Sequence, residues 1–188
     1  LVHISTDQVY NGRGPHPEDD GAPINVYGIT KYAGELEALR AGGTVLRTNF
    51  VGRPAGGGKE GFSDWIVASL RNRAPMILFQ DVLFSPLHIS SLLKCIVRAT
   101  ELRHAGVFNA GSRNGISKAD FALGLATRLR LDTGSVRLGT SAGVGLKARR
   151  PNDMRMSVER FETAFSFVLP SMQEELDKTA RDYGARVV

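Results

Sequence analysis

The sequence predicts an α/β fold built around a mostly parallel sheet. Short apolar, strand-like segments alternate with segments whose apolar residues recur at helical spacing, and the alternation continues along all 188 residues. No internal repeat and no linker divides the chain, and its second half is more irregular than its first. We therefore expect a sheet domain with a smaller lobe attached to it.

The predicted elements follow the chain in a simple order. The first half contains strands at residues 1–6, 44–47 and 76–79 and helices at about 24–40 and 62–73. Loops rich in glycine and proline occupy 11–23 and 52–61. The second half contains a helix at 87–102, a strand at 107–109, a helix at about 117–131, a weak strand at 136–138, an irregular stretch at 139–156 and a last helix at about 171–183. A capping-box pattern beginning at Ser117 opens the fourth of these helices.

Composition restricts the classes of protein to which the chain can belong. The 24 basic and 19 acidic residues give a net charge of +5, and the basic residues are scattered apart from the cluster of Lys147, Arg149 and Arg150. Scattered charge favours an ordinary basic surface over a nucleic-acid-binding stripe. No apolar run approaches the ~18 residues of a membrane span. We therefore expect neither a nucleic acid nor a membrane as a partner.

The cysteine and the histidines are poor candidates for chemistry. Cys95 is the single cysteine, so it cannot form an internal disulfide, and this favours a cytoplasmic protein. No cluster of His, Asp and Glu has zinc spacing, and we expect no metal site. His88 is interpreted as a cap or packing residue. His16 and the acidic run 18–20 are interpreted as parts of a solvated loop.

The first residues suggest a larger fold. The chain has no initiator methionine, and residues 1–6 have the pattern of a buried strand that is already under way. We expect the chain to be a fragment that begins inside a sheet domain.

Two segments carry side chains suited to proton transfer. Ser5 and Thr6 end the first predicted strand, and Tyr27 precedes Lys31 by four residues on the first predicted helix. That spacing places the tyrosine and the lysine on one helix face. Because an ammonium group near a phenol stabilises the phenolate, such a tyrosine can exchange a proton with a carbonyl or an alcohol. Open α/β sheets bind ligands at the carboxyl ends of their strands, where the two hydroxyls lie.

These segments resemble a known family. The stretches ISTDQVY (4–10) and PINVYGITKYAGE (23–35) resemble the extended short-chain dehydrogenase/reductase superfamily. Residues 45–50, 84–90 and 107–111, followed by RPNDMRMS (150–157), Phe161 and Leu169-Pro170, resemble segments of the dTDP-4-dehydrorhamnose reductases in the same order. The resemblance covers nearly the whole chain.

The resemblance implies an activity and a more specific fold. Reductases of this family reduce the C4 ketone of a dTDP-4-dehydro-6-deoxy sugar with NADPH or NADH, and a homodimer is possible. The implied fold is the C-terminal part of a Rossmann-like, doubly wound parallel sheet with a smaller α/β substrate-binding lobe. Residues of about 1–50 and part of 85–110 form the end of the cofactor-binding domain in this interpretation. Residues of about 51–84 and 111–188 form mostly the lobe.

The resemblance also implies roles for individual residues. Tyr27 would protonate the C4 oxygen, Lys31 would assist it and hydrogen-bond the nicotinamide ribose, and Thr6 would hold the substrate oxygen. The implied catalytic residues are Thr6, Tyr27 and Lys31; the implied cofactor-binding residues are Ser5, Tyr27, Lys31, Arg47, Thr48 and Asn49; the implied substrate-binding residues are Thr6, Asp7, Phe50 and Arg150. The cluster of Lys147, Arg149 and Arg150 is a candidate for the nucleotide diphosphate, because arginine pairs with phosphate in a bidentate way.

Two features depart from the family pattern. The Gly-rich turn that binds a dinucleotide between a first strand and a first helix has no counterpart in the chain, and we expect it upstream of Leu1. The glycine run at 56–59 (GGGK) does not supply a phosphate-binding turn in its place. It is not a P-loop, because Arg53 stands where a P-loop needs glycine and Glu60 stands where it needs Ser or Thr. Phe50 stands where the family commonly has a tryptophan, which leaves the choice of sugar open.

Neighbouring functions in the superfamily differ in few residues. Gln8 stands where sugar-nucleotide 4,6-dehydratases carry an acid, and a neutral amide cannot act as a general base, which disfavours dehydration. A sugar-nucleotide 4-epimerase uses the same Tyr/Lys pair and remains an alternative. A non-catalytic, reductase-like regulatory subunit, such as that of methionine adenosyltransferase, is the other alternative.

Overall fold

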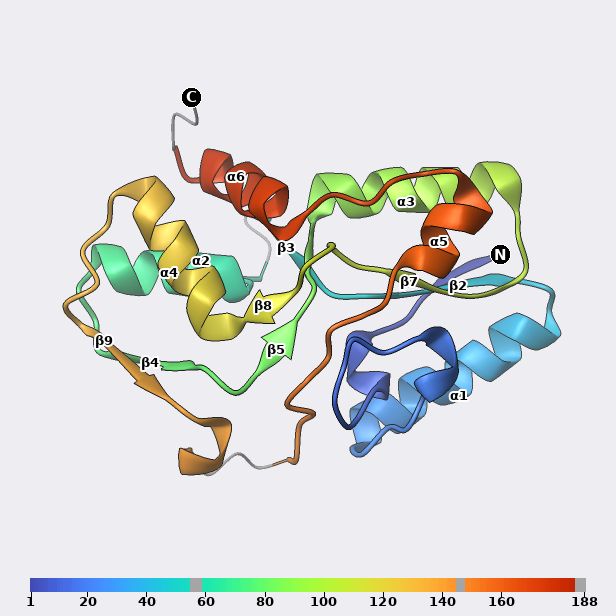
Figure 1. Cartoon of the computed structure of the whole chain (residues 1–188), viewed down its shortest axis with the longest axis horizontal. Helices are drawn as coiled ribbons and strands as arrows, with labels where there is room; N and C mark the ends of the chain where they lie inside the picture. The colour runs from blue at the N-terminus through green and yellow to red at the C-terminus, as the bar shows by residue number, and fades with distance from the viewer. Residues whose placement is uncertain (55–58, 145–147, 185–188) are drawn as a thin grey trace.

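A computed structural model describes residues 1–54, 59–144 and 148–184, and it divides into two regions with separate hydrophobic cores (Figure 1). The first, which we call the sheet region, contains a parallel sheet in the order β1–β2–β7. Its strands are β1 (Val2–Ile4), β2 (Thr44–Thr48) and β7 (Gly106–Ala110). Helix α1 (Val26–Arg40) joins β1 to β2, and α3 (Ile89–Leu102) precedes β7.

The sheet is covered on both faces, as the predicted α/β fold requires. Figure 1 shows α1 and α3 on opposite sides of the three strands. Along β2, Leu46 belongs to the apolar core that α3 shares with α5 (Glu159–Phe165), whereas Arg47 is directed to Glu35 on α1. Successive side chains of a strand point to opposite faces. One face of the sheet is therefore apolar, and the other carries a buried ion pair.

The second region, the lobe region, consists of paired short strands covered by three helices. Strand β4 (Met76–Phe79) is parallel to β9 (Val136–Gly139), and β5 (Leu83–Phe84) is antiparallel to β8 (Ile116–Ser117). The helices are α2 (Phe62–Arg71), α4 (Lys118–Leu129) and α6 (Met172–Asp182). Phe84 and Phe121 meet edge to face in its core, with ring centroids 5.5 Å apart.

A third pair of strands connects the two regions. Strand β3 (Phe50–Val51) is parallel to β6 (Leu87–His88), which leads directly into α3. The His88 side chain caps α3 by accepting from the backbone N–H of Ser90, as the sequence suggested, and its Nε2 lies 2.9 Å from Asp182 Oδ2 on α6. The last helix is therefore held to the start of α3.

Several short elements were not predicted. The two-residue strands β3, β5, β6 and β8 carry no readable alternation, and each is defined by a partner more than thirty residues away in the chain. Helix α5 lies in the predicted lobe segment, yet Phe161 and Phe165 pack into the core of the sheet region. The division of the chain at about residues 51, 85 and 111 stays a prediction.

The interpretation of His16 and residues 18–20 as parts of a solvated loop is wrong for two side chains. His16 is 2% exposed because its ring stacks on that of Tyr10, with centroids 4.9 Å apart. Glu18, the first residue of the 3-10 helix η2 (Glu18–Asp20), is buried because its Oε1 accepts the backbone N–H of Asn109 at 2.9 Å. The neighbouring acids at 19 and 20 are exposed, as expected.

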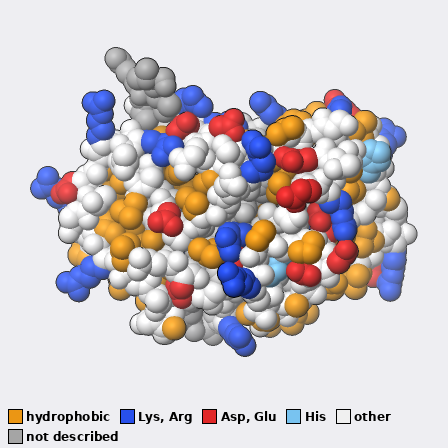
Figure 2. Space-filling model, in the orientation of Figure 1, with side chains coloured by type: hydrophobic (Ala, Val, Ile, Leu, Met, Phe, Trp, Pro, Cys, Tyr) orange, Lys and Arg blue, Asp and Glu red, His pale blue; other side chains and the backbone are white. Residues whose placement is uncertain are grey.

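The surface has mixed charge. Figure 2 shows Lys and Arg side chains interspersed with Asp and Glu over the visible face. Across the described residues, no helix combines the length and the apolar character that crossing a bilayer requires. Cys95 is a free, buried cysteine in the core of the sheet region.

Candidate active site

The predicted hydroxyl residues lie where β1 ends and a short 3-10 helix, η1 (Asp7–Val9), begins. Thr6 caps η1, since its Oγ1 accepts the backbone N–H of Gln8 at 3.2 Å. Ser5 Oγ donates to the Glu35 carboxylate on α1. Both hydroxyl residues are buried. Ser5 therefore ties the strand end to α1, and Thr6 shapes the turn that follows.

The first turn of α1 packs directly on η1. Asn25 caps α1, with its Oδ1 accepting the backbone N–H of Gly28 at 2.8 Å. A Cβ atom at position 28 would stand 2.7 Å from the carbonyl oxygen of Gln8, which is closer than real Cβ contacts allow. Glycine at this position therefore lets α1 approach the end of β1 and brings Tyr27 to Gln8, with which it lines one cavity.

The structure brings the three predicted catalytic residues to the carboxyl edge of the sheet. Tyr27 is 52% exposed in the first turn of α1. Lys31 Nζ donates to the carbonyl oxygen of Ile4, the last residue of β1, at 2.6 Å. Thr6 follows two residues later. The lysine is fixed by the main chain of β1, while the tyrosine is open to solvent beside it on the same helix.

Asp7 is the centre of a small polar cluster at this edge. It is 1% exposed, and Asn49 Nδ2 donates to its Oδ2 at 2.7 Å. Burial raises the pKa of Asp7 to about 6, against the opposing effects of the Asn49 hydrogen bond and the charge of Lys118. Burial also lowers the pKa of Lys118; the nearby Asp7 charge opposes this shift and the Arg150 charge adds to it. The family resemblance implied Asp7 as a substrate-binding residue and Asn49 as a cofactor-binding residue. It did not include Lys118 among the site residues.

Arg47 does not have the position that a cofactor ligand needs. Its guanidinium is 2% exposed, and all three nitrogens are engaged: Nε and Nη2 by Glu35, and Nη1 by the Tyr10 hydroxyl and the Glu18 carbonyl. We therefore give its side chain a structural role in place of the cofactor contact that the family resemblance implied. Thr48 is buried at the end of β2, and Asn49 follows it beside Asp7.

Three neighbouring cavities, each sharing lining residues with the next, lie where the two regions meet, and we call them together the boundary groove. One cavity is lined by Tyr27, Gln8 and Arg150, and the next is lined by Gln8, Arg150, Asn49 and Lys118. The two cavities adjoin because they share Gln8 and Arg150. Tyr27 and the exposed Arg150 therefore face the same cavity, the first of the two.

The boundary groove continues into the lobe region. A third cavity shares Lys118 and Phe79 with the second and is lined further on by Phe62 and Trp65. Phe62 stacks on Trp65 with ring centroids 6.1 Å apart. This end of the groove is an aromatic wall, whereas its other end carries Tyr27.

The remaining predicted residues have varied positions. Phe50 is 54% exposed at the start of β3. Arg150 is exposed, and the carbonyl oxygen of Arg149 accepts from Asn25 Nδ2 at 3.1 Å. Lys147 and most of the run at 56–59 lie outside the described residues.

The only signal for Lys118 in the sequence is its place after the helix cap Ser117, which gives no reason to connect it with Asp7.

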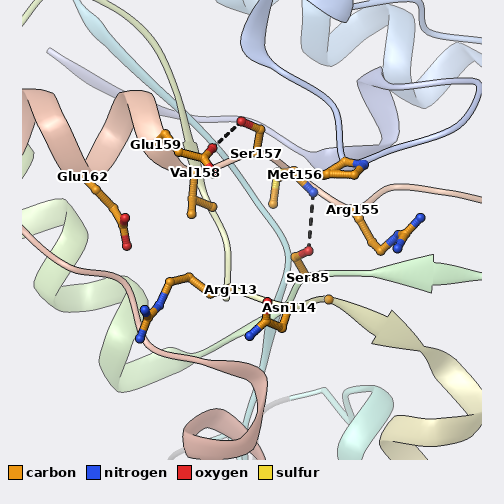
Figure 3. Close-up of a pocket in the computed structure, with 11 residues that line it drawn as sticks. Ser85, Arg113, Asn114, Arg155, Met156, Ser157, Val158, Glu159 and Glu162 are labelled. Carbon is orange, nitrogen blue, oxygen red and sulfur yellow. Dashed lines mark hydrogen bonds between the residues drawn. The ribbon is translucent and has the colours of Figure 1, made fainter.

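A separate cavity lies between α5 and the loop that joins β7 to β8 (Figure 3). Figure 3 shows Arg113, Glu159 and Glu162 toward one end and Arg155 toward the other. None of the predicted site residues lines this cavity. Within residues 1–54, 59–144 and 148–184, no group of three or more His, Cys, Asp or Glu side chains could hold a metal ion.

Solved structures share this architecture. A dTDP-4-dehydrorhamnose reductase from Bacillus anthracis, solved in complex with NADP, superposes with a TM-score of 0.85 at 24% identity, over 95% of this chain and 64% of that one. The parallel sheet with helices on both faces and the attached lobe therefore define a Rossmann-like α/β protein, as predicted.

Sequence comparison identifies the family. The profile of the RmlD substrate binding domain matches residues 1–184, and the chain belongs to this family. The dTDP-4-dehydrorhamnose reductase of Escherichia coli K12 is 28% identical over 188 residues, covering 92% of this chain. The methionine adenosyltransferase 2 subunit beta of Pongo abelii is 28% identical over 185 residues, covering 87% of this chain and 52% of its own length. The chain spans 62% of the length of the E. coli relative.

Proposed function

We propose that the protein to which this chain belongs reduces the C4 ketone of a dTDP-4-dehydro-6-deoxy sugar with NADPH or NADH. The observation that carries the proposal is the boundary groove, which begins at the exposed Tyr27 on α1 and ends at the aromatic wall of the lobe region. The named activity of the E. coli and B. anthracis relatives supports the same reaction.

The chemistry along the boundary groove follows the order of groups in a nucleotide sugar. Tyr27 can serve a sugar at one end, Arg150 offers a guanidinium for phosphate in the middle, and Phe62 and Trp65 offer flat apolar surfaces at the other end. Guanidinium groups suit phosphate oxygens, and aromatic faces suit a planar base. A nucleotide sugar lying along the groove therefore places its sugar at Tyr27.

Within this proposal each predicted catalytic residue has a distinct task. The Tyr27 phenol donates a proton to the C4 oxygen, so that the ketone becomes an alcohol rather than an alkoxide. Lys31, held by the Ile4 carbonyl, places a positive charge at the carboxyl end of β1, where it stabilises the phenolate that remains. The family resemblance assigns the substrate oxygen to Thr6, whose Oγ1 also caps η1. Asp7 orients the Asn49 amide that lines the groove.

The nicotinamide half of the cofactor fits the carboxyl ends of β1 and β2. In parallel sheets ligands bind at this edge, and the polar residues here that could contact the nicotinamide and its ribose are Lys31, Thr48 and Asn49. Ser5 acts through Glu35 and positions the strand end. When bound, a reduced nicotinamide supplies the hydride for C4.

The proposal is tested with the protein expressed from its complete reading frame. We expect consumption of NADPH with dTDP-4-dehydro-6-deoxy-L-mannose, and a loss of kcat of ~10²-fold or more in Tyr27→Phe, the range for removing a general acid. The matched control is Tyr32→Phe, the same substitution one turn further along α1, where the hydroxyl has no role in the proposal. We expect its kcat to change less than about threefold.

Other outcomes contradict the proposal in different ways. Folded protein that binds NADPH and leaves the ketone unchanged favours a regulatory subunit, to which the similarity with the methionine adenosyltransferase subunit points. Interconversion of sugar nucleotides without net NADPH consumption favours an epimerase. Equal turnover by Tyr27→Phe and by the unchanged protein removes the tyrosine as the acid.

We further propose a cytoplasmic protein that forms a homodimer. The single, buried and unpaired Cys95 suits a reducing compartment. Ile29 and Leu36 leave apolar side chains exposed on α1, which is a surface that a second copy could cover. Light scattering at several concentrations measures the mass, and a monomer throughout contradicts the homodimer.

A further inference from the structure

Lys118 is the one charged residue of the boundary groove that the family resemblance does not explain. It is the first residue of α4 and belongs to the lobe region, yet its charge acts on Asp7 in the sheet region and on Arg150. It lines both the second and the third cavities of the groove. The side chain therefore stands where the polar part of the groove meets its aromatic wall.

The ammonium group of Lys118 packs against the aromatic rings of Phe62 and Phe84 and donates no hydrogen bond to a described residue. Nζ lies 5.0 Å from the centroid of Phe62 and 6.0 Å from that of Phe84. Among the residues that the structure describes, no side-chain or backbone oxygen accepts a hydrogen bond from Nζ and no carboxylate forms an ion pair with it. An ammonium group has three donors, and contact with aromatic faces leaves them available.

The charges around Lys118 favour an anion. Arg150 lines the same cavity, and its charge disfavours the charged form of Lys118. The Asp7 carboxylate acts on Lys118 in the opposite sense to Arg150, and it is already bonded to Asn49. A ligand with phosphate oxygens would relieve the repulsion and satisfy the free donors at once.

We propose that Lys118 binds a phosphate oxygen of the substrate, between the sugar end of the boundary groove and its aromatic wall, and so selects nucleoside diphosphates over uncharged nucleosides. The proposal deepens the proposed function and rests on it for the identity of the substrate. Arg150, which lines the same cavity, would bind the same diphosphate. The rings of Phe62 and Phe84 would hold the ammonium group in position before the ligand arrives.

The single tryptophan of the chain gives a direct readout. Trp65 stacks on Phe62, the ring that contacts the Lys118 ammonium group, so a ligand at this point changes its surroundings. The experiment titrates the protein, expressed from its complete reading frame, with dTDP and with thymidine, following calorimetric heat and, independently, tryptophan fluorescence. The variants are Lys118→Met, which keeps the packing on the rings but not the charge, and Lys118→Arg, which keeps the charge.

We expect Lys118→Met to raise the Kd for dTDP about tenfold or more and to leave the Kd for thymidine unchanged, because a charge-assisted bond is worth at least ~1.4 kcal/mol. Lys118→Arg should stay within about fivefold of the unchanged protein. The matched control is Lys94→Met, which removes an exposed lysine on α3 and should leave both constants unaltered.

Three results overturn the inference. An unchanged Kd for dTDP in Lys118→Met means that the ammonium group does not touch phosphate, and an equal loss for dTDP and thymidine means that Lys118 only packs the wall. Failure of the unchanged protein to bind dTDP removes the ligand class. These results are separate from the test of the function: Tyr27→Phe can abolish turnover whatever Lys118 does, and dTDP can bind through Lys118 in a protein without turnover.

Discussion

The two regions of the molecule are stabilised in different ways. On the α1 face of the sheet region, Arg47 and Glu35 form an ion pair in which the side chains are only 2% and 1% exposed. The lobe region is built around a large apolar cluster that includes Phe84, Phe121 and Leu125. A buried ion pair is directional and tolerates little change, whereas an apolar core accepts other side chains of similar volume.

The difference bears on how the site is positioned. Ser5 donates to the same Glu35 carboxylate that binds Arg47, so the polar network fixes the end of β1 directly before Thr6. The lobe region holds Lys118 through contacts with Phe62 and Phe84. The proposed reacting end of the groove is therefore held by hydrogen bonds, and the proposed binding end by packing.

The largest expected effect comes from breaking the buried ion pair. Arg47→Leu leaves the Glu35 carboxylate buried without its partner, and we expect the free energy of unfolding in urea to fall by about 3–5 kcal/mol. The double variant Arg47→Leu/Glu35→Leu removes both charges and should recover most of that loss.

An exposed pair on the same helix serves as the control. Arg40 and Glu37 lie 2.5 Å apart with side chains 75% and 70% exposed, so Arg40→Leu should cost less than about 1 kcal/mol. A loss for Arg47→Leu no larger than this would mean that the buried network does not hold the sheet region together.

The second effect is a pH dependence at the boundary between the regions. Because burial raises the pKa of Asp7 to about 6, from its ordinary value of 3.8, the folded state binds its proton more tightly than the unfolded state. The contribution of Asp7 to stability is therefore greatest below pH ~4 and is lost as the pH rises to ~6, by an amount on the order of 3 kcal/mol.

Asp7→Asn isolates this contribution, since an amide keeps the shape and does not titrate. We expect the stability of Asp7→Asn, relative to the unchanged protein, to increase between pH 4 and pH 6 and to level off above that range. Urea unfolding at a series of pH values measures it. A difference that stays constant with pH would show that Asp7 is not the group responsible.

The smallest effect tests the tolerance of the lobe region. Leu125 is fully buried in its apolar core, and Leu125→Met conserves volume, so the free energy of unfolding should fall by less than about 1.5 kcal/mol. The comparable conservative change in the sheet region, Arg47→Lys, loses the bidentate geometry toward Glu35 and should cost more. Thermal melts of both variants rank the two costs, and the reverse order contradicts the comparison.

Local patterns in the sequence were sufficient for most of the fold. The bounds of α1, α4 and α6 agree with the prediction to within two residues, because the signals that mark helix ends, such as the cap Ser117, are local. The strand Met76–Phe79 was predicted with the same bounds. The two-residue strands and α5 were missed because their patterns are too short to read and their partners lie far along the chain.

The sequence by itself determined the alternation of strands and helices and placed Thr6, Tyr27 and Lys31 at the end of the first strand and on the following helix, because these features depend on neighbours within a few turns. Only the tertiary structure decided which polar side chains are used inside the fold. Arg47 turned out to be enclosed by Glu35 and Tyr10, whereas Lys118 came to face Asp7 and Arg150. Burial and charge depend on residues distant in sequence, so both facts follow from packing and not from any local pattern.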